Sequence, residues 1–242
     1  MVSMPLSRRA GLGSGPHLFV QAAVALALLA ALAAPASAAP RTVLVVSEAR
    51  DFVHDSIPAA RAALHRLESA RLRVRDIRAA DVTRAGLRGA DAVIFVHTTG
   101  ELPVDRRALR RFVRRGGGLV GFHAATDAFQ SWPGWERLIG GRFVRHDAPA
   151  VETVRIRRGH AAVRGVPRTF RMHEEYYRHE PGVARRARVL ATWGDERLPL
   201  VWVRTPGRGR VFYSALGHFS ATWTDPRHEA LVRSGVRWVL GG

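Results

Sequence analysis

The segment GGGLVGFHAATD, residues 116–127, indicates both the class of fold and a candidate site. Three glycines precede a short apolar run, Leu119–Phe122, and this run ends at His123. A brief apolar run is typical of a parallel strand buried on both faces, and ligands of such sheets bind just beyond the carboxyl ends of the strands. On related architectures, a small-x-nucleophile-x-small turn at this point carries serine or cysteine. Residues 121–125 have this spacing with an imidazole in place of the nucleophile, so we expect a functional role for His123.

The pattern around this segment alternates predicted strands with predicted helices. In the first half, strands are predicted at residues 42–47, 72–77, 91–96 and 118–122, and helices at residues 58–69 and 104–115. Strands separated by such helices form right-handed βαβ units and a parallel sheet covered on both faces. In the second half, short strands are predicted at residues 151–156, 189–193, 199–203 and 210–216, before a final helix at residues 226–240. The sequence therefore predicts one α/β domain, residues 39–242, with a parallel sheet and a β-rich C-terminal extension.

Residues 1–38 have the pattern of a secretory signal peptide. Arg8 and Arg9 form a basic start, residues 18–34 are rich in alanine and leucine, and residues 35–38, PASA, fit the A-x-A cleavage rule. The uninterrupted apolar part, residues 22–34, is shorter than the ~20 residues of a membrane span. We therefore expect cleavage after residue 38, a secreted or periplasmic protein, and no membrane span after cleavage. A retained N-terminal anchor is the alternative, and the twin-arginine route competes with general export.

The composition excludes one kind of chemistry and argues against another. The chain has 0 cysteines, which excludes thiol nucleophiles, thiolate metal sites and redox pairs. The net charge is +18, but all 38 basic residues are arginine, which indicates a bias of the whole sequence. The densest arginines, in residues 106–115, fall opposite Leu109, Phe112 and Val113 at helical spacing, as on a solvated helix face. We therefore expect no specific nucleic-acid partner, only incidental attraction to acidic surfaces.

Histidines follow four of the predicted strands. They are His54 after the first, His97 after the third, His123 after the fourth and His218 after the strand at residues 210–216. The carboxyl ends of parallel strands meet at one edge of a sheet, so the loops beyond them form a crevice. A single histidine on an apolar run is usually structural, but repetition at equivalent positions favours a functional cluster.

Five segments of this chain resemble the ThuA-like family, which is named for trehalose utilisation. They are FVHDSIPAARAAL (52–64), HTTGELP (97–103), GGGLVGFHAATDAFQSWPGWERLIGGRFVRH (116–146), EEYYR (174–178) and GRVFYSALGHFSATW (209–223). The resemblance implies a flavodoxin-like fold similar to the class I glutamine amidotransferases, and a link to carbohydrates, in particular to oxidised 3-keto sugars. In those amidotransferases a cysteine occupies the position of His123, and an acid that of Ser220. The chain is therefore not a glutaminase that works through a thioester.

The resemblance and the strand-end positions together indicate site residues, which fall into three sets. The expected catalytic residues are His123, His218 and Glu175. The expected metal ligands are His54, His123, His146 and His218. The expected substrate-binding residues are Thr98, Thr99, Asp127, Trp132, Tyr176 and Tyr177, with packing as the alternative role of Trp132. We interpret His97 as a structural or rim histidine, and Glu174 as the partner of an arginine.

Two mechanisms suit these residues, and neither uses a covalent intermediate. In the first, imidazoles and Glu175 hold a divalent metal such as zinc, which keeps one position for water and polarises a keto sugar. In the second, His123 and His218 act as an acid–base pair beside the ketone. Glu174 and Glu175 are adjacent, so on a strand they point to opposite faces and cannot flank one sugar as a glycosidase pair does. We expect a carbohydrate-active hydrolase, lyase or isomerase; the alternative is a non-catalytic sugar-binding module, and the oligomeric state is left open.

Overall fold

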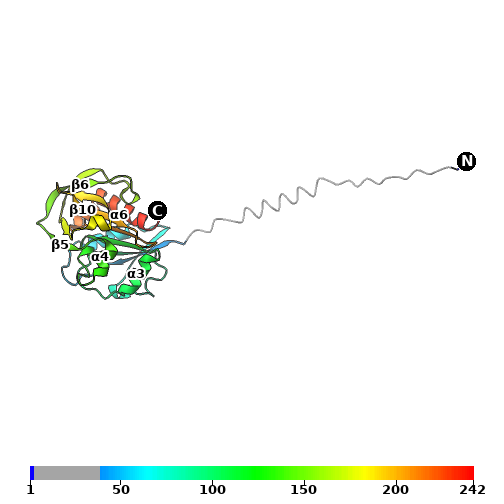
Figure 1. The fold of residues 1–242 in the computed structure, drawn as a ribbon, viewed down its shortest axis with the longest axis horizontal. Coiled ribbons are helices and arrows are strands. Elements are labelled where there is room, and N and C mark those ends of the chain that lie inside the picture. Colours follow the sequence, from blue (N-terminus) through cyan, green and yellow to red (C-terminus); the bar gives the residue numbers. More distant parts are fainter. Residues whose placement is uncertain (3–38) are drawn as a thin grey trace. The chain divides into compact units, whose positions relative to one another are not determined.

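The structure, a computed structural model, describes residues 1–2 and 39–242. The predicted signal peptide, residues 1–38, thus lies outside the described residues except for its first two, and its cleavage stays a prediction. Residues 40–242 form one compact unit (Figure 1). None of the helices described has the length and hydropathy that a bilayer-spanning segment needs.

A nine-stranded sheet runs through the described part of the chain, in the order β2-β1-β3-β4-β11-β10-β9-β6-β7. Its parallel half consists of β1 (Arg41–Val46), β2 (Leu72–Asp76), β3 (Ala92–Val96), β4 (Gly118–Phe122) and β11 (Arg210–Ser214). Its antiparallel half consists of β6 (Ala150–Ile156), β7 (Thr169–Glu174), β9 (Arg188–Trp193) and β10 (Leu198–Arg204). The predicted flavodoxin-like α/β class is confirmed. One strand differs from the prediction, because β11 joins the parallel half beside β4 instead of extending the β-rich part.

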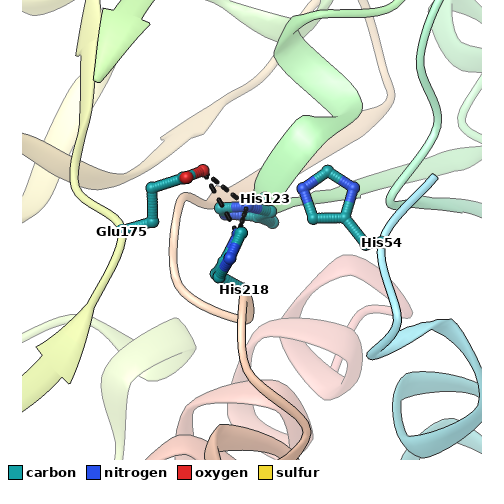
Figure 2. A group of neighbouring side chains, drawn as sticks. All are labelled: His54, His123, Glu175 and His218. Carbon is teal, nitrogen blue, oxygen red and sulfur yellow. Dashed lines mark hydrogen bonds and ion pairs between the residues drawn. The ribbon is translucent and has the colours of Figure 1, made fainter. Parts of the chain in front are cut away.

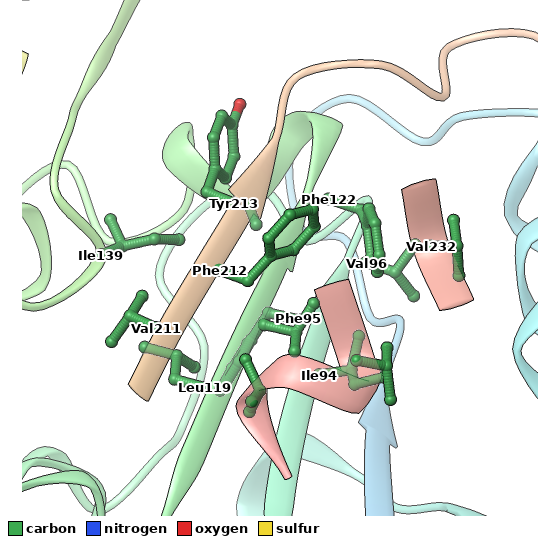
Figure 3. Close-up of a cluster of buried hydrophobic side chains, with 14 of the residues drawn as sticks. Ile94, Phe95, Val96, Leu119, Phe122, Ile139, Val211, Phe212, Tyr213 and Val232 are labelled. Carbon is green, nitrogen blue, oxygen red and sulfur yellow. The ribbon is translucent and has the colours of Figure 1, made fainter. Parts of the chain in front are cut away.

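Helices cover both faces of the parallel half, and two glycines of β4 show how closely they pack. A Cβ on Gly118 would lie 2.1 Å from Val239 of α6 (Pro226–Val239), whereas one on Gly121 would lie 2.6 Å from Ile139 of α4 (Pro133–Ile139). Positions three apart on a strand face opposite sides, so α6 and α4 lie on opposite faces of β4. The core between these layers is formed by buried aromatic and branched side chains of β3, β4 and β11 (Figure 3).

Two helices begin where an aspartate caps them. The Asp105 carboxylate accepts hydrogen bonds from the amides of Arg107 and Ala108 at the start of α3 (Arg106–Arg114), and Asp225 does the same for α6. Such side-chain caps satisfy amides that have no partner within the helix. The arginines of α3 point outward while Leu109 and Val113 are buried, which confirms the predicted amphipathic helix. The remaining helices are α2 (Ile57–His65), α5 (Val183–Arg186) and the 3₁₀ turns Ala79–Asp81, His123–Thr126, Ala161–Val163 and Ser220–Thr224.

A separate two-stranded ribbon, which the sequence pattern did not predict, lies outside the main sheet. Its antiparallel strands are β5 (Phe143–His146) and β8 (Tyr177–His179). The register places His146 opposite Tyr177. The ribbon therefore brings two predicted site residues together from segments that are about thirty positions apart in the chain.

Candidate functional site

Three imidazoles and one carboxylate meet beyond the carboxyl ends of the parallel strands. Each of His54, His123, Glu175 and His218 offers one ligand atom, and these atoms all lie within 4.8 Å of one another. Figure 2 shows that they come from four segments: the loop after β1, the turn after β4, the residue after β7 and the loop after β11. We call these four residues the His–Glu cluster. The predicted convergence of strand-end histidines is confirmed.

His123 occupies a strained turn that fixes its ring. Its φ is +48°, in the left-handed region that residues other than glycine seldom adopt. The Tyr213 hydroxyl donates to the carbonyl of His123 at 2.7 Å, and Nδ1 of His123 lies 2.8 Å from the carbonyl oxygen of Ala215. This hydrogen bond assigns the proton to Nδ1, because a carbonyl only accepts. The other nitrogen, Nε2, then presents a lone pair to the cluster, as in histidines that bind metals.

The shortest distances within the cluster join three atoms. Nε2 of His123 and Nδ1 of His218 are 3.2 Å apart, and Oε2 of Glu175 lies 3.2 Å from His218 Nδ1 and 3.5 Å from His123 Nε2. Burial alone would raise the pKa of Glu175, but its interactions with the facing imidazoles of His123 and His218 outweigh burial and hold this pKa far below its usual range. Burial lowers the pKa of His218, yet the hydrogen bond and charge of Glu175 outweigh burial and raise that pKa above its ordinary value. The carboxylate is therefore ionised and ready to bind a cation.

His54 completes the cluster from a loop that is pinned to β3's end. The Thr99 hydroxyl donates to the carbonyl of Phe52 at 3.0 Å and accepts from the amide of Asp51 at 3.3 Å. Nδ1 of His54 is buried and has no hydrogen-bond partner among the described residues. Burial, followed by the neighbouring His123 and His218, lowers the pKa of His54 to about 3. The ring is therefore neutral at physiological pH, which is the form that binds metals.

The donor set fits a zinc ion or a similar divalent metal. Ligand atoms that lie about 2.0–2.1 Å from zinc in a tetrahedral site are about 3.3 Å from one another. The three distances among His123 Nε2, His218 Nδ1 and Glu175 Oε2 are 3.2, 3.2 and 3.5 Å, the dimensions of one triangular face of such a site. His54, with its unpartnered nitrogen, stands beside this face as a further donor. Neutral imidazoles with one carboxylate are ordinary ligands of zinc.

Three more predicted residues surround the cluster. Nδ1 of His146 lies 3.2 Å from Oε1 of Glu175, the carboxylate oxygen that does not face the other histidines, and 41% of the His146 side chain is exposed. The Tyr177 ring packs against that of His123, with centroids 4.4 Å apart. Asp127 lies in the turn after β4, where burial, followed by the charge of Asp51, raises its pKa. His146 is therefore not among the four clustered ligands but contacts one of them, Glu175.

Other predicted residues are buried away from the cluster's ligand atoms or held by internal contacts. Thr98 and Thr99 are fully buried, and Thr99 holds the loop that carries His54. The Tyr176 hydroxyl donates to the carbonyl of Met172, and its ring stacks on Trp193. Trp132 is 9% exposed and packs against Phe129 and Trp135. These contacts favour the packing alternative for Trp132 and give Tyr176 a structural role.

Two residues beside the cluster differ from their sequence interpretation. Glu174 is fully buried, and its carboxylate accepts from the amides of Gly217 and His218, both at 3.1 Å. Among the described side chains no arginine forms an ion pair with it, so the interpretation as an arginine partner is wrong. His97 is fully buried, 4.8 Å from the His54 ring, which excludes a rim position and leaves the structural role. For His97, its place at a strand end was the only indication in the sequence that it lies near the site. For Glu174, nothing in the sequence indicated which groups it binds.

Comparison with known proteins identifies the family. The profile described as "ThuA: Trehalose utilisation" matches residues 42–239. Among solved structures, the chain is similar to ThuA-like proteins from Bacteroides uniformis (20% identity, TM-score 0.72, covering 85% of this chain and 94% of that one) and Parabacteroides merdae (20%, 0.70, 83% and 90%). It is also similar to part of a β-galactosidase from Rahnella sp. R3 (18%, 0.58, 91% and 34%). At these identities the likeness shows the fold alone. No curated protein matches. With nearly all of residues 39–242 matched, this chain belongs to the ThuA (trehalose utilisation) family, which links it to carbohydrate metabolism.

Proposed function

We propose that this protein is an exported enzyme that acts on a sugar carbonyl, in an oxidised sugar or keto-glycoside, with a divalent metal held by the His–Glu cluster. The observation that carries the proposal is the triangle of His123, His218 and Glu175, whose edges have the length that a tetrahedral zinc site requires. Family membership supports the sugar, and the resemblance to ThuA-like proteins supports its oxidised form.

The metal and the surrounding side chains would each have a separate role in the reaction. A metal in the cluster would polarise the carbonyl of the sugar and stabilise the negative charge that develops on its oxygen. The hydrogen bond to Ala215 and the strained turn keep His123 Nε2 directed at the cluster. Asp127, whose pKa burial raises, would accept a proton at a carboxylate oxygen from the carbon next to the carbonyl. His146, held through Nδ1 by Glu175, would present Nε2 at the exposed side to protonate a leaving oxygen.

A second candidate mechanism needs no metal. The 3.2 Å contact between His123 Nε2 and His218 Nδ1 allows the two rings to share a proton, and Glu175 stabilises the charged form of His218. The two rings would then serve as an acid–base pair beside the ketone. This candidate predicts full turnover after complete removal of divalent metal.

Metal analysis of purified residues 39–242 separates the two mechanisms. We expect about one equivalent of zinc or a similar metal, lost in the double variant His123→Ala/His218→Ala and retained in the control His65→Ala, whose ring pairs with Asp76 at the protein surface. Turnover is then measured on matched glycosides and their 3-keto forms, with and without a chelator. Keto-sugar turnover that stops on chelation supports the proposal, and chelator-resistant turnover assigns the acid–base pair. Saturable sugar binding without turnover, unchanged by the double substitution, would show a sugar-binding module instead.

Export is tested separately, on the full chain. The proposal predicts that expression of residues 1–242 in a bacterial host releases a protein whose N-terminus is Ala39. An uncleaved chain in the membrane fraction would show the retained anchor instead, and an uncleaved chain in the cytoplasm would contradict export.

A further inference from the structure

Glu174 is a buried carboxylate for which the proposed chemistry has no use. It is the last residue of β7 and is 0% exposed. In the sheet, β7 is the outermost strand of the antiparallel half, four positions from β11. Its side chain nevertheless reaches the loop that follows β11. A buried charge is costly unless hydrogen bonds compensate it, so its partners indicate its role.

Four donors surround this carboxylate. Oε1 accepts from the Gly217 amide at 3.1 Å and from the Thr222 hydroxyl, and Oε2 accepts from the amides of His218 and Glu175, both at 3.1 Å. Three of these donors belong to residues 217–222, which include the cluster residue His218. The fourth is the amide of Glu175, another cluster residue. A carboxylate is the side chain that can accept all four, because each of its oxygens offers two lone pairs.

The Gly217 carbonyl, in the loop that Glu174 holds, is bound by two other side chains. The Gly217 carbonyl accepts from the indole nitrogen of Trp223 at 2.8 Å and from the Ser56 hydroxyl at 3.3 Å. Gly217 has φ +129°, and a Cβ there would lie 2.9 Å from the Trp223 ring. The backbone at residues 217–218 is thus fixed from both sides, and this backbone sets where the His218 ring lies.

We infer that Glu174 is a positioning residue, which fixes the backbone of His218 and Glu175 so that their side chains form the metal-binding triangle. The inference rests on the proposed metal site. The two adjacent glutamates then have separate roles, since Glu175 contributes a ligand atom and Glu174 holds the backbone on either side of the triangle. Substitution of groups that orient metal ligands typically weakens metal binding 10–100-fold.

The test compares zinc affinity in wild type and Glu174→Gln, measured by chelator competition, with the visible spectrum of the cobalt(II) form as a second readout. Glutamine keeps the size of glutamate, but its NH₂ group faces donors and cannot accept. We expect zinc affinity to fall about 10–100-fold and the cobalt bands to shift. Glu180→Gln, which removes a carboxylate paired with Arg142 beyond β8, should change neither. Equal affinity and an unchanged spectrum in Glu174→Gln would overturn the inference.

A second control, Val154→Ala, distinguishes the positioning role from a general loss of stability. Val154 is a buried core residue of β6, the strand next to β7. Val154 pairs with Phe170 and Trp193 on neighbouring strands, not with residues 217–222, so this variant should lose stability and keep its zinc affinity. A loss equal to that of Glu174→Gln at equal destabilisation would overturn the inference. Where Glu174→Gln does not fold, Glu174→Asp decides: its shorter side chain cannot reach all four donors, and unchanged zinc affinity would refute the positioning role.

A separate measurement distinguishes absence of the metal site from absence of a positioning role for Glu174. If the wild type binds no zinc, the proposed function fails, and hydrogen exchange of the amides of Gly217 and His218 decides the role of Glu174. Exchange at least ~10-fold faster in Glu174→Gln than in wild type would show that the carboxylate holds this backbone, and equal exchange rates would refute it.

Discussion

Replacing Glu175 by glutamine should nearly abolish the stabilisation of this protein by zinc. Glu175 supplies the only carboxylate of the His–Glu cluster, and its Oε2 lies 3.2 and 3.5 Å from the facing nitrogens of His218 and His123. A ligand that binds only the folded protein stabilises it by RT ln(1 + [L]/Kd), which is about 2.7 kcal/mol at 100 times Kd. For a domain of 150–250 residues, about 1 kcal/mol raises Tm by ~2–4 °C, so wild type should gain about 5–10 °C.

In Glu175→Gln we expect the Kd for zinc to rise about 100-fold. The zinc concentration that was 100 times Kd for wild type then only equals the Kd of the variant. Zinc would stabilise the variant by about 0.4 kcal/mol, which is about 1 °C in Tm. Thermal unfolding is followed by circular dichroism on chelator-treated residues 39–242, with and without zinc. The control is His65→Gln, which removes a partly exposed imidazole on α2 and should keep the full gain. An equal rise in Tm for Glu175→Gln and wild type, or no rise in wild type, would refute the proposed metal site.

Three further substitutions test the structure around the site. Burial lowers the pKa of His228 to about 4, so the folded protein keeps this ring neutral down to about that pH. In the unfolded chain the same ring takes up a proton below about pH 6.5. The folded protein should therefore lose about 3 kcal/mol of stability as the pH falls from 6.5 towards 4. His228→Leu, which puts an apolar side chain in place of the buried imidazole, should reduce that acid loss in urea unfolding at pH 7 to 4, and identical pH profiles would contradict this. Trp132→Ala should lower the free energy of unfolding by about 3–5 kcal/mol while zinc affinity measured by chelator competition stays unchanged; weaker zinc binding would instead tie this tryptophan to the site. Gly217→Ala should cost about 1–3 kcal/mol in urea unfolding and also weaken zinc binding, because a Cβ would meet the Trp223 ring and displace His218; a variant as stable as wild type would show that the turn tolerates a side chain.

The predicted helices and strands of the parallel half rest on patterns that burial imposes directly. Residues 118–122 and 92–96 are continuous apolar runs, and both are strands buried at every position. Because parallel strands end at one edge, the positions of His54 and His123 after such runs predicted that they meet, and the place of His218 after a further apolar run added it to the group. Periodicity thus determined the fold class and indicated three of the four residues in the cluster, while the parallel pairing of β11 with β4, which carries His218 to this edge, came only with the structure.

The direction of individual side chains depends on contacts between distant segments, which a single sequence does not show. The ribbon of β5 and β8 places His146 on the outer oxygen of Glu175. Glu174 reaches the loop after β11 from a strand four positions away, and Tyr176 turns to Trp193 while its neighbour Tyr177 packs on His123. In the adjacent pairs Glu174–Glu175 and Tyr176–Tyr177, the local backbone decides which of two chemically similar residues faces the cluster. The sequence alone therefore determined which groups gather at the edge of the sheet, and only the tertiary structure decided which of their atoms meet, because that depends on hydrogen bonds between segments far apart in the chain.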